Sequence, residues 1–127
     1  MTVDDFEPWR SCVRRILASR ADLHIVGEAA NGMEAVRKAE ELQPDLILLD
    51  IGMPDLNGIE AARRIRTLAP KSLILFLTLQ RSSDIAREAL NAGAQGYVIK
   101  TDAESDLLPA IEAVLSGKQF ISSRLED

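Results

Sequence analysis

The chain contains the stretch Leu46-Ile47-Leu48-Leu49-Asp50-Ile51-Gly52-Met53-Pro54-Asp55-Leu56-Asn57-Gly58. It begins with an apolar run of strand length, passes through an acidic residue into a loop with glycine and proline, and leads into a segment of helical period at residues 59–68. Such an alternation of strand-length and helical segments is typical of a parallel sheet with helices on both faces. The stretch therefore predicts an α/β fold with Asp50 at the carboxyl end of a strand.

The same unit recurs along the whole chain. Strands are predicted at residues 2–4, 23–27, 46–49, 73–77 and 97–99, and helices at residues 8–19, 33–41, 59–68, 84–92 and 104–116. Right-handed crossovers leave few arrangements for such a sheet, and the flavodoxin-like order 2-1-3-4-5 is favoured. We therefore expect a doubly wound five-stranded parallel sheet flanked by five helices. One domain is expected over residues 1–118, with residues 119–127 as the start of a linker or a C-terminal tail.

Two of the predicted helices begin with the spacing of a capping box. Asn31 precedes Glu34, and Thr101 precedes Glu104, at the same interval. In this motif the first side chain accepts a hydrogen bond from the backbone N–H of the later residue. Asn31 and Thr101 are therefore expected to cap the second and fifth helices.

Composition excludes several classes of protein. Hydrophobic residues make up 46% of the chain and charged residues 28%, which is ordinary for a globular domain. The single cysteine, Cys12, cannot form an intramolecular disulfide. No stretch approaches the roughly 20 apolar residues that a membrane span needs, and the N-terminus is acidic. A net charge of -5 disfavours contact with a nucleic-acid backbone. A cytoplasmic domain without membrane or direct nucleic-acid contact is expected.

Chemically active residues follow the predicted strands. Asp4 and Asp5 follow the first strand, Asp50 the third, Thr78 the fourth and Lys100 the fifth. Each has an ordinary explanation alone, but parallel folds of this type bind ligands at the carboxyl ends of their strands. An acidic set without histidine or cysteine favours a hard cation, and Mg²⁺ is the usual one beside phosphoryl groups.

These residues belong to motifs that resemble one known family. Val3-Asp4-Asp5, the stretch from Leu46 to Gly58, Leu77-Thr78 and Gly96-Tyr97-Val98-Ile99-Lys100 resemble the ordered motifs of receiver domains of bacterial two-component response regulators. The resemblance covers the chain essentially from end to end. Ala92-Gly93-Ala94, Gly96-Tyr97 and the residue other than proline after Lys100 resemble the NarL/FixJ-type branch.

The resemblance implies a role for each site residue. Asp50 would be the nucleophile that accepts a phosphoryl group. Mg²⁺ would be bound directly by Asp5, through water by Asp4, and by Asp50 and the backbone carbonyl of Gly52. Lys100 would pair with the phosphoryl oxygens and Thr78 would donate its hydroxyl to one of them. Tyr97 would turn inward with Thr78 as part of the switch.

The resemblance also implies partners. The donor would be a sensor histidine kinase, a phosphotransfer protein or a small acyl phosphate, and a homodimer is one expected output. A helix-turn-helix DNA-binding domain usually follows in this branch, so any contact with DNA would belong to that domain. The chain is expected to be a signalling switch that takes part in its own phosphorylation and dephosphorylation.

Two features depart from the family pattern. Only Met1, Thr2 and Val3 precede the acidic pair, so the interior first strand is short. We expect underpacked neighbours, with either a start upstream or a loose N-terminal end. Leu79 stands where many receivers carry a small residue, and its bulk is expected to slow access to Asp50.

Three other functions are also compatible with part of the sequence. A haloacid-dehalogenase-like phosphohydrolase would carry a second acid two residues after the nucleophile, where this chain has Gly52. A flavin or nucleotide binder would carry a glycine-rich phosphate loop after the first strand, and the sequence has none there. A pseudo-receiver would only mediate contacts, which a complete acceptor set disfavours.

Overall fold

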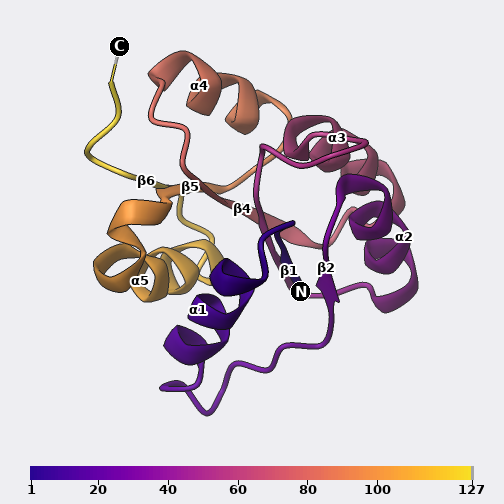
Figure 1. The fold of residues 1–127 in the computed structure, drawn as a ribbon, viewed down its shortest axis with the longest axis horizontal. Coiled ribbons are helices and arrows are strands. Elements are labelled where there is room, and N and C mark those ends of the chain that lie inside the picture. Colours follow the sequence, from indigo (N-terminus) through magenta and orange to yellow (C-terminus); the bar gives the residue numbers. More distant parts are fainter. Residues whose placement is uncertain (127) are drawn as a thin grey trace.

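The computed structural model describes residues 1–126 and forms one parallel sheet between two layers of helices (Figure 1). The sheet has the order β2-β1-β3-β4-β5-β6. The strands are β1 (Thr2–Val3), β2 (Glu28–Ala29), β3 (Leu46–Leu49), β4 (Leu73–Thr78), β5 (Gly96–Ile99) and β6 (Phe120–Ile121). The helices are α1 (Glu7–Leu17), α2 (Gly32–Leu42), α3 (Gly58–Leu68), α4 (Ser83–Asn91) and α5 (Ala103–Leu115), with a 3₁₀ turn at Lys100–Asp102.

The side chains of the central strands alternate between two apolar cores. On one face Ile47, Leu49 and Phe76 pack with α2, α3 and α4. On the other face Leu48 and Leu75 pack with α1 and α5. Successive residues of a strand point to opposite faces, so a fully apolar strand such as β3 serves both cores. Figure 1 shows the two groups of helices on opposite sides of the sheet.

The predicted fold class and the order of the first five strands are confirmed. Each of the five predicted helices is present with ends within two residues of those expected. The sheet has one more strand than predicted, because Phe120 and Ile121 pair in parallel with Gly96 and Tyr97. The division at residues 118 and 119 stays a prediction. No helix in residues 1–126 is long and apolar enough to cross a membrane.

The prediction for the second strand is wrong. Residues 23–27 form no strand, and β2 comprises Glu28 and Ala29, which pair with Thr2 and Val3. The short β1 explains the difference, because a strand exists only where a neighbouring strand offers hydrogen bonds. The pairing begins at Thr2, whose N–H donates to the carbonyl of Gly27 at 3.1 Å. The apolar run at residues 23–27 is therefore a partly exposed connection that leads into β2, and not a strand.

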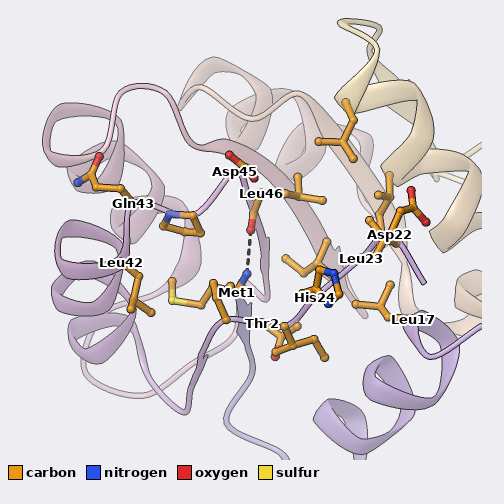
Figure 2. A pocket seen from close by; sticks show the side chains of 16 residues that line it. Met1, Thr2, Leu17, Asp22, Leu23, His24, Leu42, Gln43, Asp45 and Leu46 are labelled. Atoms are coloured by element: carbon orange, nitrogen blue, oxygen red, sulfur yellow. Dashed lines mark hydrogen bonds between the residues drawn. The ribbon is translucent and has the colours of Figure 1, made fainter. Parts of the chain in front are cut away.

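A cavity of about 530 Å³ lies at the amino end of β1, opposite to the end that carries Asp4 (Figure 2). Leu23, Leu42 and Leu46 are among its lining residues. Met1 lies at its inner wall, where the terminal ammonium donates to the carbonyl of Leu46 at 2.9 Å. Burial lowers the pKa of this ammonium to about 6, and the nearby Asp45 partly opposes the shift. This is the poor packing expected beside a short interior strand.

Of the two predicted helix caps, one is confirmed. The Asn31 side chain accepts from Glu34 N at 2.8 Å, and the Glu34 carboxylate accepts from the N–H of Ala30. The Thr101 cap is wrong, because the chain leaves β5 through the 3₁₀ turn and α5 begins only after Asp102. The Thr101 hydroxyl instead accepts from Arg81 at 3.4 Å.

Candidate functional site

Three carboxylates meet at the carboxyl ends of two neighbouring strands. Asp4 and Asp5 follow β1, and Asp50 follows β3, which pairs directly with β1. One oxygen from each lies within 4.8 Å of the others. Asp4 and Asp50 are buried, whereas Asp5 is exposed. The sheet thus brings together the three acids that the sequence predicts as metal ligands.

Lys100 reaches the same place from the end of β5. Its ammonium lies 2.7 Å from Asp4 Oδ2 and 3.2 Å from Asp50 Oδ2, and only 4% of the residue is exposed. Three carboxylates and one ammonium leave a formal charge of −2, which one divalent cation would neutralise. Oxygen ligands alone suit a hard cation. The donor set therefore fits Mg²⁺ in both chemistry and charge.

Asp50 is held in a defined orientation. Its Oδ1 accepts from the N–H of Ile51 at 2.8 Å, while its Oδ2 pairs with Lys100. Burial raises the pKa of Asp50, Lys100 works against that rise, and the neighbouring Asp4 adds to it. The fold therefore carries a carboxylate whose negative charge is unfavourable in its surroundings. A bound cation would relieve this.

Trp9 contacts the site from the first turn of α1. The Lys100 ammonium lies 5.0 Å from the centre of its ring, within the range of a cation–π interaction. The ring forms a third side of the environment of Lys100, beside Asp4 and Asp50. No sequence motif marks this contact, since it depends on how α1 packs against β1 and α5, beside the turn that carries Lys100.

The loop after Asp50 is shaped by a close backbone approach. A Cβ on Gly58 would lie 1.9 Å from the backbone oxygen of Asp50, and the Gly58 N–H donates to the carbonyl of Ile51 at 2.8 Å. Asp55 adopts a left-handed conformation with φ of 69°. Gly52 differs, because a Cβ there would meet nothing within 4 Å. Glycine is thus required at residue 58, whereas the metal-binding role of the Gly52 carbonyl stays a prediction.

Thr78 and Tyr97 are joined through one residue of the loop after β4. The N–H of Gln80 donates to the Thr78 hydroxyl at 3.3 Å, and the Tyr97 hydroxyl donates to the Gln80 carbonyl at 2.9 Å. Tyr97 is fully buried, lies against Phe76 and has its pKa raised to about 12 by burial and by the charge of Asp50. Its ring therefore points inward. Gln80 has no signal in the sequence, because it acts through its backbone.

Comparison with known proteins agrees with this geometry. The response regulator receiver domain family matches residues 1–112. The response regulator protein VraR of Staphylococcus aureus is 38% identical over 116 residues, which are 91% of this chain and 56% of VraR. The chain thus spans about half the length of the curated relatives it matches.

Two solved structures are also similar. A two-component response regulator of the LuxR family from Aurantimonas sp. SI85-9A1 has 39% identity and a TM-score of 0.92, covering 97% of this chain and 88% of that one. The isolated REC domain of RcsB from Salmonella enterica serovar Typhimurium, in the presence of the phosphomimetic BeF3−, has 25% identity and a TM-score of 0.90. That match covers 98% of this chain and 96% of the other. The chain belongs to the response regulator receiver domain family.

Proposed function

We propose that this domain is a phosphorylation switch in which Asp50 accepts a phosphoryl group with the help of Mg²⁺. The observation that carries the proposal is the convergence of Asp4, Asp5, Asp50 and Lys100 at one edge of the sheet. Three acids beside a single ammonium form a site for a cation and for the anionic group that reacts next to it.

In the proposed reaction a carboxylate oxygen of Asp50 forms a bond to the phosphorus of a phosphohistidine. The donor P–N bond breaks, its electron pair stays on the imidazole, and the imidazole takes up a proton. The Ile51 N–H holds the other side of the carboxylate and so fixes its direction. The product is an aspartyl phosphate. A small acyl phosphate reacts in the same way, with a carboxylate as leaving group.

Asp5, Asp50 and the Gly52 carbonyl would hold Mg²⁺ directly, with Asp4 acting through water. A bound Mg²⁺ supplies positive charge that offsets the charge of the transferring phosphoryl group. Lys100 now contacts Asp4 and Asp50, so it must turn from these carboxylates to pair with the phosphoryl oxygens. Its buried position keeps the ammonium within reach of both arrangements.

Thr78 and Tyr97 would carry the signal away from Asp50. The Thr78 hydroxyl would leave Gln80 N and donate to a phosphoryl oxygen. Because Gln80 also binds Tyr97, this change reaches the loop before α4 and the edge of the sheet. Phosphorylation would thus favour one of two arrangements of this region.

The partners in this proposal are a sensor histidine kinase or a phosphotransfer protein, both expected in the cytoplasm. A transcriptional effector domain would receive the output, by homodimerisation or by release. The LuxR-family relative supports this effector class. The domain itself would act as a switch and not as an enzyme on free substrates.

Incubation with acetyl phosphate and Mg²⁺, followed by intact mass measurement, tests the proposal. One added phosphate is expected on the native chain and on Asp22→Asn, a control change at an exposed residue beside the cavity at the opposite end of the sheet. Asp50→Asn should stay unmodified. Absence of the adduct on the native chain would favour the pseudo-receiver, and continuous consumption of acetyl phosphate without an adduct would favour the hydrolase.

A further inference from the structure

The residues after α5 do not leave the domain but return along its edge. Phe120 and Ile121 extend the sheet beyond β5 in parallel register. In Figure 1 the chain then continues from β6 toward the start of α4. Residues 120–126, here called the C-terminal segment, therefore run beside both β5 and the loop that joins β4 to α4. Leu125 packs against the core that contains Tyr97.

The first anchor of the C-terminal segment is Ser122. Its N–H donates to the carbonyl of Tyr97 at 2.9 Å, and its hydroxyl oxygen accepts from the N–H of Ile99 at 3.0 Å. Only 3% of Ser122 is exposed. The Ser122 hydroxyl thus binds the Ile99 N–H of β5 just beyond the end of β6. In a longer β6, a backbone carbonyl would accept this hydrogen bond.

The second anchor is Glu126. Its N–H donates to the carbonyl of Arg81 at 2.7 Å, and its carbonyl accepts from Ser83 N at 2.8 Å. Its carboxylate also lies 3.1 Å from Arg81 Nε. The end of the C-terminal segment is therefore bound through both backbone and side chain to the loop between β4 and α4.

This loop binds both predicted switch residues, Thr78 of β4 and Tyr97 of β5, through Gln80. Gln80 accepts from Tyr97 and donates to Thr78, and the next residue, Arg81, binds Glu126. The Tyr97 backbone carbonyl also binds Ser122. Any displacement of Thr78 toward Asp50 that moves Gln80 therefore acts on both anchors of the C-terminal segment.

We propose that the edge of β5 and the loop of residues 79–82 form a docking surface for the C-terminal segment, and that phosphorylation of Asp50 strengthens this docking. The proposal rests on the proposed function of Asp50. Its direction rests on Tyr97, which is buried and bound to Gln80 while the segment is docked, the inward arrangement assigned to the phosphorylated state. Thr78 still accepts from Gln80 N in this structure, and phosphorylation would release that bond.

Amide hydrogen exchange with and without beryllofluoride and Mg²⁺ tests the docking. The N–H groups of Ser122 and Glu126 are expected to exchange at least about fivefold more slowly when the phosphate mimic is bound, which is the lower range of allosteric coupling. Unchanged or faster exchange at both amides would overturn the proposal. Binding of the mimic is followed by the fluorescence of Trp9, the single tryptophan of the chain.

Coupling is reciprocal: if the mimic strengthens docking by a given factor, the docked domain binds the mimic more tightly by that factor, and loss of docking weakens binding of the mimic by up to the same factor. Ser122→Ala removes the acceptor for Ile99 N and is expected to lower the affinity for beryllofluoride about fivefold, whereas Ser123→Ala, at an exposed neighbour, leaves it unchanged. Equal affinities of the two variants would count against the docking role.

A second pair of variants distinguishes loss of docking from loss of folding. Glu126→Ala removes only the carboxylate beside Arg81 Nε, whereas Glu126→Pro also removes the N–H that donates to the Arg81 carbonyl, so the proline variant should bind the mimic more weakly than the alanine variant. Failure of this proposal is distinct from failure of the proposed function. If acetyl phosphate modifies Asp50 but neither exchange nor affinity responds, only the docking proposal falls. If no adduct forms at all, the proposed function falls with it.

Discussion

Replacement of Gly58 by alanine tests how tightly the acceptor loop is built. A Cβ at this position would lie 1.9 Å from the backbone oxygen of Asp50 and 2.8 Å from the Cα of Ile51. The first contact must widen to about 3.4 Å, the start of the ordinary range, so the beginning of α3 must move away from Asp50. Neither neighbouring atom belongs to a flexible side chain that could yield.

The cost has two physical parts. Overpacking at a close-packed site costs about 1–3 kcal/mol. Lengthening the Gly58 N–H bond to the Ile51 carbonyl adds about 1 kcal/mol. The expected loss is therefore about 2–4 kcal/mol in the free energy of unfolding, or about 8–15 °C in the melting temperature of a domain of this size.

Gly52→Ala is the matched control, because it makes the same change in the same loop with nothing within 4 Å of the new methyl group. Thermal unfolding followed by circular dichroism should place Gly52→Ala within about 2 °C of the native chain, in line with substitutions that meet no close neighbours. Mg²⁺ titration followed by Trp9 fluorescence should show weaker binding for Gly58→Ala. Equal melting temperatures of the two variants would refute the reasoning.

The remaining predictions concern the surroundings of the site and the opposite end of the sheet. Trp9→Leu removes the ring beside Lys100, an interaction of about 0.5–2 kcal/mol, and should slow phosphorylation by acetyl phosphate about two- to thirtyfold in intact-mass time courses; a native rate would contradict the positioning role. Leu79→Ala should speed phosphoryl exchange without changing the free energy of unfolding, because Leu79 is 55% exposed, and equal exchange rates would dismiss its role in access. The pKa of the Met1 ammonium is about 6 in the folded chain and 8.0 in an unfolded one. Between pH 6 and pH 8 the unfolded chain therefore binds more protons than the folded chain. Stability should therefore rise from pH 6 to pH 8, by at most about 2–3 kcal/mol, in urea unfolding at the two pH values, and acetylation of the N-terminus should remove that rise.

Much of the architecture could be predicted because its causes are local. Fully apolar runs such as Leu46–Leu49 and the cap at Asn31 determine elements without reference to the rest of the chain. The proximity of Asp4, Asp5, Asp50 and Lys100 could also be predicted, because each residue follows a predicted strand. Parallel strands place their carboxyl ends at one edge of the sheet.

Features that depend on another element could not be predicted in this way. The register of β2 depends on the length of β1, so an apolar run at residues 23–27 was mistaken for the strand. The two-residue β6 carries no pattern of its own, and its presence depends on the open edge of β5. The link from Thr78 through Gln80 to Tyr97 uses backbone atoms of Gln80, which any residue type would supply.

The pairing of β6 with β5 also has a consequence for solubility. A bare outer strand offers unpaired N–H and C=O groups to which a strand of another molecule can add. Here Phe120 and Ile121 occupy that border, and the Ser122 hydroxyl accepts the next N–H, that of Ile99. Because β6 has only two residues, it covers the edge of β5 and leaves few unpaired N–H and C=O groups on its own outer side. Whenever the C-terminal segment detaches, the domain therefore becomes a template for self-association, so the same residues protect the protein from aggregation.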